Sequence, residues 1–173
     1  VTEAVRILRD RGEKVTFLVI GPVDTPEKEL FNGVFNRPGY RESVIHVPWI
    51  SLAELPSYLT VADAGISPII KSEQHDTTIA NKMFQYSLFG KPLLVSDCVP
   101  QVRIVETDRS GLVFRSGNAE DLAEKILFLM KNPQTAREMG ENGRHAVTTK
   151  YNLVEGSKEL IAMYEQESMK IRS

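Results

Sequence analysis

The chain has 173 residues, a length that suits one domain with a single hydrophobic core. Its 21 basic and 23 acidic residues give a formal net charge of -2, so the chain lacks the strong basic field of a nucleic-acid binder, and we expect no nucleic-acid partner. One cysteine, Cys98, excludes an intrachain disulfide and a cysteine-rich metal site, and we expect no metal.

Cellular location is predicted from the same composition. No apolar run approaches the roughly 20 residues of a membrane-spanning helix, and the first residues lack the charged-then-apolar layout of a signal peptide. With the lone cysteine, this predicts a soluble cytoplasmic protein. Peripheral association of the full-length protein with a membrane, through partners or further segments, stays open.

Helices and strands are predicted to alternate from the start of the chain. Residues 1–11 place apolar side chains on one helical face, and Gly12 is a stop signal. This helix has no capping residue, which suggests that the chain starts inside a larger protein. The apolar, β-branched run 15–20 is typical of a parallel strand that is covered on both faces. A second helix is then predicted, with Pro26 in its first turn.

The same alternation continues through the middle of the chain. Residues 43–47 are predicted as a second strand, and Ser51 with Glu54 forms a capping box that opens a helix. Residues 62–67 are a third strand, which ends at Pro68. This order predicts a Rossmann-like α/β domain with one parallel sheet, right-handed crossovers and helices on both faces.

The last part of the chain is predicted to be rich in helices. A strand around Leu93–Val95 and another at 110–114 are followed by a helix that Asn118 caps. Further helices are predicted from Pro133 and from about Leu153.

The stretch from His75 to Glu106 carries the main functional hypothesis, because ligands bind outside the carboxyl ends of strands in open α/β sheets. A helix that begins near Thr77 or Thr78 would present free backbone N–H groups to an anion, and Lys82 would place an ammonium near the same point. We therefore expect this stretch to hold the diphosphate of a nucleotide-linked sugar. In the competing explanation, Thr77 is an ordinary N-cap and Lys82 a solvated helix residue.

Other polar and aromatic residues each have a ligand-binding and a structural interpretation. Gln85 would hold a ribose hydroxyl or be an exposed helix residue. Trp49 would cover a nucleobase or pack in the core. His75 and Asp76 are adjacent, and adjacent loop residues seldom face each other, so an acid–base pair has little support and His75 is better explained as a loop residue or substrate contact.

Common motifs of other classes are missing. The chain contains no Gly-x-Gly-x-x-Gly after a strand, no phosphate-binding P-loop and no Gly-x-Ser-x-Gly nucleophile elbow. These absences argue against a dinucleotide-dependent dehydrogenase, a P-loop enzyme and an α/β-hydrolase.

The segment from Thr77 to Cys98, with its Thr-Thr-Ile, Asn-Lys, Phe-Gln-Tyr, Gly-Lys-Pro and Val-Ser-Asp-Cys elements, resembles the donor-site segment of the group 1 (family 4-like) retaining GT-B glycosyltransferases. The loop after residue 47, the strand at 62–67 and Gly111–Phe114 match that family in order and spacing. The resemblance implies that residues 1–173 are the C-terminal, nucleotide-sugar-binding half of a GT-B fold. It also implies a first strand and an N-terminal domain outside this chain, the latter binding a glycan, lipid or small-molecule acceptor.

The resemblance also implies roles for individual residues. The Glu-x7-Glu pattern of the family falls on Thr77, at the sugar contact, and on Gln85, at the ribose. Backbone N–H groups of Thr78, Ile79 and Ala80 fall where the family binds the donor phosphates. The family binds the base with the loop that follows its second strand, and these positions correspond to Val47, Pro48 and Trp49 in this chain.

These roles lead to a retaining glycosyl transfer from a nucleotide diphosphate sugar. Lys82 and the N–H groups would stabilise the leaving diphosphate, with Thr77 beside the sugar and with no cofactor or metal. Two alternatives remain, a non-catalytic nucleotide-sugar-binding module and an interaction domain in which the loop is only capped. The isolated chain is expected to be inactive in transfer, because the acceptor site lies elsewhere.

Overall fold

The computed structural model describes residues 1–23, 28–29, 33 and 43–172. The helix predicted from Pro26 falls largely outside these ranges. The described elements, in chain order, are α1 (Thr2–Asp10), β1 (Phe17–Ile20), β2 (Val44–Val47), α3 (Leu55–Val61), β3 (Gly65–Ser67), α4 (Lys82–Leu88), β4 (Leu93–Ser96), α5 (Val99–Asp108), β5 (Gly111–Phe114), α6 (Ala119–Lys131), α7 (Pro133–Thr149) and α8 (Leu153–Arg172).

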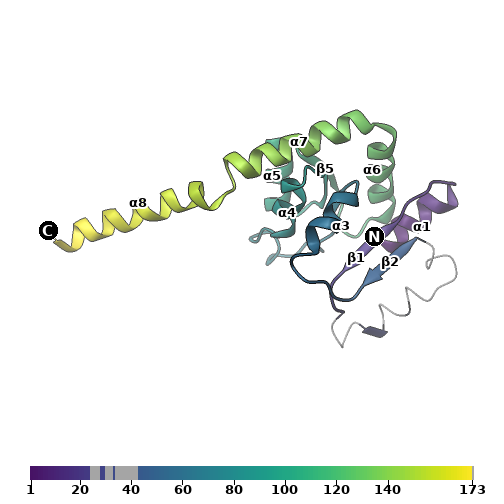
Figure 1. The fold of residues 1–173 in the computed structure, drawn as a ribbon, viewed down its shortest axis with the longest axis horizontal. Helices are drawn as coiled ribbons and strands as arrows, with labels where there is room; N and C mark the ends of the chain where they lie inside the picture. Colours follow the sequence, from purple (N-terminus) through teal and green to yellow (C-terminus); the bar gives the residue numbers. More distant parts are fainter. Residues whose placement is uncertain (24–27, 30–32, 34–42, 173) are drawn as a thin grey trace.

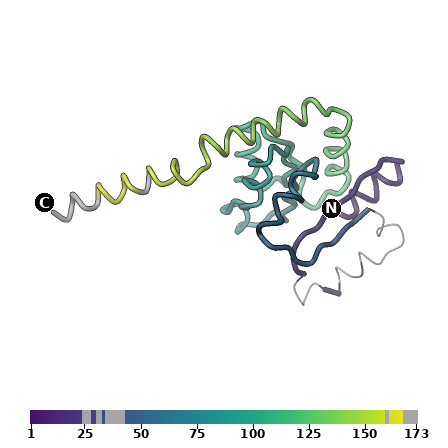
Figure 2. The backbone as a smooth tube through the Cα atoms, in the orientation of Figure 1, coloured from purple at the N-terminus to yellow at the C-terminus, as the bar shows by residue number. Residues whose placement is uncertain are grey.

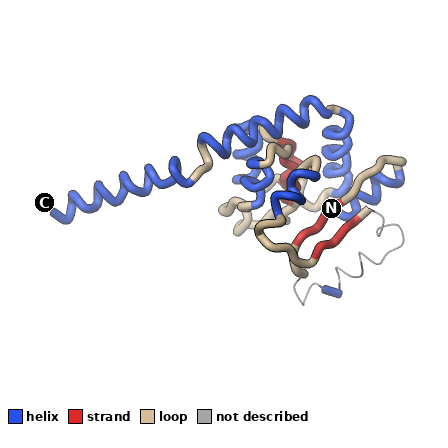
Figure 3. Tube along the Cα trace, in the orientation of Figure 1, coloured by secondary structure: helices blue, strands red, loops and turns tan. Residues whose placement is uncertain are grey.

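The strands are all parallel, which confirms the predicted α/β class, but they form two sheets instead of one. In the first sheet β1 pairs with β2, with Phe17 opposite Val44. The second sheet has the order β3-β4-β5, and Leu93 of β4 lies between Gly65 and Gly111. Within the described residues no strand bridges β1 and β3, so each lies at the edge of its sheet, and the described strands form two sheets where one was predicted (Figure 3).

One hydrophobic cluster packs α1 and α6 against the second sheet. It contains buried side chains of α1, β4, β5 and α6, namely Ala4, Leu8, Leu94, Phe114, Leu122, Ala123 and Leu129. Because α1 precedes β1 and packs with α6, the first sheet is attached to the second through this helical layer (Figure 1). Burial of these apolar side chains is the main stabilising contribution to the domain.

The opposite face of β4 packs on α4 and α5. Met83, Leu93, Val95, Ile104 and Val105 form the second buried cluster. Leu94 points into the first cluster, while its neighbours Leu93 and Val95 point into the second, as the alternation of a strand requires. Helices therefore cover both faces of the second sheet, as predicted.

Helix α4 lies close to α7 because small residues line the contact. A Cβ atom added to Gly140 would overlap the carbonyl oxygen of Gly90, directly after α4. Gly143 likewise lies against Ser87, where an added Cβ would be 3.1 Å from Oγ. On the sheet side, the ring of Tyr86 occupies the space that a side chain at residue 65 would need. These contacts determine where α4 presents its outward face.

Helix α8 extends away from the body of the molecule (Figures 1 and 2). It begins at Leu153, as predicted, and several of its apolar side chains are exposed, including Leu153, Val154 and Tyr164. None of the described helices has both the length and the apolar character that crossing a membrane would require.

Candidate functional site

The loop between β3 and α4 differs from the prediction. Helix α4 begins at Lys82, so the helix start expected at Thr77 or Thr78 is wrong. The hydroxyl groups of Thr77 and Thr78 instead donate back to the carbonyl of Gln74, at 2.8 and 3.4 Å. Such side-chain bonds to the backbone compete with helix formation and favour a turn. Thr77 is therefore a turn residue and caps no helix.

The backbone after this turn offers unused donors. In the part of the chain that the structure describes, the N–H groups of Thr78, Ile79 and Ala80 reach no protein acceptor. Thr78 and Ile79 are exposed, whereas Ala80 is half-buried against the cluster around Met83. Exposed N–H groups in a turn at the end of a parallel strand can bind an anion.

Lys82 lies directly after these donors, at the first position of α4. Its side chain is half-buried, and it forms no ion pair with any described acidic residue. Desolvation by burial lowers the pKa of the Lys82 ammonium from its ordinary value. A bound anion would compensate for this desolvation, so Lys82 is well placed to hold a phosphate group.

Gln85, one turn further along α4, is exposed. Its side chain makes no hydrogen bond to the described residues, so its amide can meet a ligand. Lys82 and Gln85 lie on the outer side of α4, whereas Met83 and Ser87 are buried on its inner side. Lys82 and Gln85 thus lie in the first turn of α4, directly after the loop at Thr77–Ala80.

His75 and Asp76 do not bond to each other. The His75 ring nitrogen Nδ1 lies 2.7 Å from the carbonyl oxygen of Ile70, which keeps the ring within its own loop. Asp76 accepts a hydrogen bond from the backbone N–H of Val99 at 2.9 Å. The two side chains form separate hydrogen bonds and do not make an acid–base pair, as expected for adjacent loop residues.

Val47, Pro48 and Trp49 follow β2, in the other sheet. Trp49 is 74% exposed, so the alternative that it packs in the core is wrong. Among the described residues no hydrogen bond or ion pair joins these three positions to the loop at Thr77–Ala80. They form a second group of candidate residues, which the structure leaves accessible.

Two residues that the sequence analysis missed hold the loop after β3. The Ser116 hydroxyl accepts from the N–H of Lys71 at 2.9 Å, and Asp97 Oδ1 accepts from the N–H of Ser116 at 2.8 Å. The Lys71 ammonium lies 3.9 Å from Asp97 Oδ2. Asp97 follows β4 and Ser116 follows β5, and this position at strand ends was the available signal.

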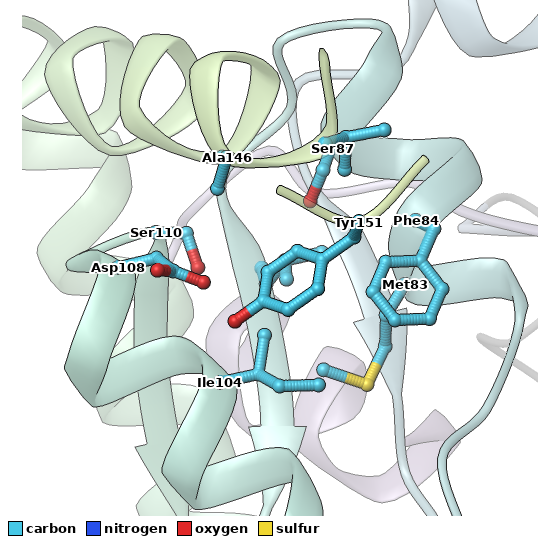
Figure 4. Close-up of a pocket in the computed structure, with 11 residues that line it drawn as sticks. Met83, Phe84, Ser87, Ile104, Asp108, Ser110, Ala146 and Tyr151 are labelled. Atoms are coloured by element: carbon cyan, nitrogen blue, oxygen red, sulfur yellow. The ribbon is translucent and has the colours of Figure 1, made fainter. Parts of the chain in front are cut away.

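A small cavity lies on the inner side of α4, and Lys82 is not among the residues that line it (Figure 4). Its lining includes Ser87, Asp108, Ser110 and Tyr151, and about 10 Å³ of it is open to the centre of a water molecule. That space suits roughly one water molecule and no nucleotide. This cavity is therefore not the donor site, and the candidate residues lie on the open surface at the loop after β3.

The comparisons place the chain in a family. Residues 1–132 match the family model described as glycosyl transferases group 1. The chain therefore belongs to the group 1 glycosyl transferases, as its resemblance implied.

Individual proteins are similar to this chain in sequence or in fold. An alpha-D-kanosaminyltransferase from Streptomyces kanamyceticus is 21% identical over 164 residues, which are 95% of this chain and 41% of that protein. Sucrose-phosphate synthase from Thermosynechococcus elongatus has a similar fold, with a TM-score of 0.82 and 19% identity over 98% of this chain and 42% of that one. Anabaena HepE, solved in complex with UDP, has a TM-score of 0.78 and 16% identity over 88% of this chain and 41% of that one.

The chain spans about two-fifths of the length of these proteins. Its fold matches the GT-B glycosyltransferases among them, which confirms the predicted fold class.

Proposed function

We propose that residues 1–173 are the donor-binding domain of a glycosyltransferase that uses a nucleotide diphosphate sugar and retains the configuration of the transferred sugar. The observation that carries the proposal is the set of N–H groups at Thr78–Ala80 that bond to no described acceptor, beside Lys82, a half-buried cation that pairs with no described acidic residue. The similar fold of HepE, solved with UDP, supports a nucleotide ligand.

The chemistry follows from the charge that develops during transfer. When the glycosidic bond of the donor breaks, its electron pair leaves with the diphosphate. Positioned N–H groups and the Lys82 ammonium stabilise that negative charge more than the charge of the intact donor. Thr77, exposed at the same turn, is the proposed sugar contact. The scheme needs no cofactor or metal.

The nucleoside is assigned to the remaining candidates. The Gln85 amide binds ribose hydroxyl groups, and the loop at Val47–Trp49 holds the base, with the exposed Trp49 ring available for stacking. His75, whose ring is tied to Ile70, lines the donor loop.

We also propose that this chain is the C-terminal half of a longer, cytoplasmic enzyme whose other domain binds the acceptor. The relatives are more than twice as long as the part that matches. Among the described strands, β1 and β3 both lie at sheet edges, and β1 is only half-buried along its length whereas β4 is fully buried. A further parallel strand between β1 and β3 would join the two sheets and cover β1.

Titration calorimetry with UDP, GDP and ADP tests the proposal. We expect binding of at least one nucleotide and about a tenfold loss of affinity in Lys82→Ala, because a charge-assisted contact to phosphate is removed. Lys131→Ala is the matched control, since Lys131 is exposed at the end of α6 and distant in sequence from the loop. Equal affinity of the Lys82→Ala variant and the unsubstituted chain would refute the role of Lys82.

A non-catalytic nucleotide-sugar-binding module is the second candidate. It is favoured by Thr77 and Gln85, which replace the two carboxylates of the family pattern. The isolated chain is expected to be inactive in transfer under either proposal. A longer protein that binds the donor but neither transfers nor hydrolyses the sugar would favour the non-catalytic module.

A further inference from the structure

Asp76 caps helix α5 from a distant loop. The residue before α5 is Cys98, and its side chain makes no capping hydrogen bond. The carboxylate of Asp76 takes that place, because Oδ1 accepts from the N–H of Val99, the first residue of the helix, at 2.9 Å. An acidic acceptor is favoured at this end of a helix by the unpaired N–H groups and the helix dipole.

This bond holds the second half of the loop after β3. The first half is held by Ser116, whose hydroxyl accepts from the N–H of Lys71 at 2.9 Å and donates to the carbonyl of Ile69 at 3.4 Å. Further along the loop, the side chain of Asp76 is the one that bonds to a described residue outside the loop. The exposed residues 77–79 then run between two attachments, the Asp76 carboxylate and the packed side chain of Ala80.

The helix that Asp76 caps is packed into the core. Gln101 of α5 is fully buried, and Ile104 and Val105 pack in the cluster on β4. A hydrogen bond to α5 therefore ties the loop to the core of the second sheet. If the tie is lost, the loop samples more conformations and the fraction competent to bind falls.

We propose that Asp76 is a positioning residue of the donor site, whose carboxylate, bound to the N–H of Val99, holds the N–H groups of Thr78–Ala80 where they meet a nucleotide diphosphate. The inference rests on the proposed function, and it gives Asp76 a role that needs no contact with the donor. Val99 takes part in the same interaction through its backbone N–H group.

Four variants of the 173-residue chain separate this role from a general effect. Asp76→Ala removes the acceptor, and Asp76→Asn keeps an oxygen that can accept from Val99. Val99→Pro removes the N–H donor from the other side, at a first-turn position where proline is tolerated and after Cys98, whose ψ of 131° suits a residue before proline. Glu73→Ala is the charge control, since Glu73 is an exposed acidic residue of the same loop.

UDP and GDP affinities and backbone amide NMR spectra are measured for each variant. We expect Asp76→Ala and Val99→Pro each to weaken nucleotide binding about tenfold, and the double variant to be no weaker than either, because all three lack the same bond. Asp76→Asn and Glu73→Ala should stay within about threefold of the unsubstituted chain. The amide signals of residues 77–80 should shift in Asp76→Ala and Val99→Pro, and not in Asp76→Asn or Glu73→Ala.

The outcomes distinguish the two proposals. If the unsubstituted chain binds no nucleotide, the proposed function is contradicted, while the amide shifts still report whether Asp76 orders the loop. Unchanged affinity in Asp76→Ala, or additive losses in the double variant, would overturn the positioning role. An unfolded Asp76→Ala leaves Val99→Pro to decide, because that variant alters no residue of the loop.

Discussion

At the scale of single residues, Lys82 links stability to binding. Burial lowers its pKa, so the charged side chain costs the free protein some stability. We predict that Lys82→Met raises the free energy of unfolding at neutral pH by up to about 1 kcal/mol, after allowance for solvent screening, while it weakens nucleotide binding. Urea denaturation measures the first effect, with Lys131→Met as the control for an exposed lysine. A less stable Lys82→Met protein would contradict the prediction.

The sign of the pH dependence follows from the same shift. The pKa of Lys82 is lower in the folded chain than the ordinary value of 10.5, so the unfolded chain holds the proton to higher pH. The destabilisation of the folded chain by the buried Lys82 charge is therefore fully present at neutral pH, and it is relieved as pH rises through the folded pKa of Lys82. We predict that the stability difference between Lys82→Met and the unsubstituted chain shrinks in alkaline buffer. A difference that is constant or grows with pH would show that burial of the charge is not its cause.

Single residues also show what the sequence could and could not predict about the site. The sequence pattern identified the stretch that contains Thr77, Lys82 and Gln85, because a run of polar residues after an apolar strand can be recognised from the sequence alone. The backward hydrogen bonds of Thr77 and Thr78, and the bond of Asp76 to Val99, depend on how the loop closes in space. Propensity alone therefore placed the start of α4 too early.

At the scale of elements, the contact between α4 and α7 is a sensitive point. Gly140→Ala would push the new Cβ atom into the carbonyl oxygen of Gly90, which is backbone and cannot rotate away. We predict a loss of about 1–3 kcal/mol in the free energy of unfolding, as for other overpacked contacts. Gly156→Ala in α8 is the matched helical control, because its new Cβ meets no other atom within 4 Å. Equal effects of the two substitutions in urea denaturation would contradict the prediction.

Two asparagine N-caps give a second comparison between elements. The Asn118 side chain accepts from the N–H of Asp121 at 2.9 Å, whereas Asn81 precedes α4 without a side-chain cap bond. We predict that Asn118→Ala lowers the unfolding free energy by about 1 kcal/mol and that Asn81→Ala changes it by less than half as much. Thermal and urea unfolding of both variants check this. A larger loss in Asn81→Ala would contradict the capping argument.

The order of helices and strands was predictable because each has its own period of apolar residues. Asn118 and Pro133 marked helix starts that the structure confirms. The division into two sheets was not predictable, because it depends on which strand edges meet. The pattern of β1 is that of a covered strand, although the structure leaves it half-buried.

At the scale of the whole molecule, α8 is separate from the folded body (Figure 1). Its exposed apolar side chains add little to the buried clusters. We predict that a chain ending at Asn152 keeps the unfolding free energy within about 1 kcal/mol and keeps the nucleotide affinity, since Lys150 and Tyr151, which contact Asp108 and Phe84, remain. Urea denaturation and calorimetry of both lengths test this. A large loss of either quantity would show that α8 supports the body.

The most direct test of the central claim is a UDP titration of the 173-residue chain followed by backbone and tryptophan side-chain NMR. We predict that saturable shifts concentrate at Thr78–Ala80, Lys82 and Gln85, with a further shift of the Trp49 indole signal. No saturable shift with UDP or GDP, or shifts confined to the cavity around Tyr151, would contradict the donor site described for this domain.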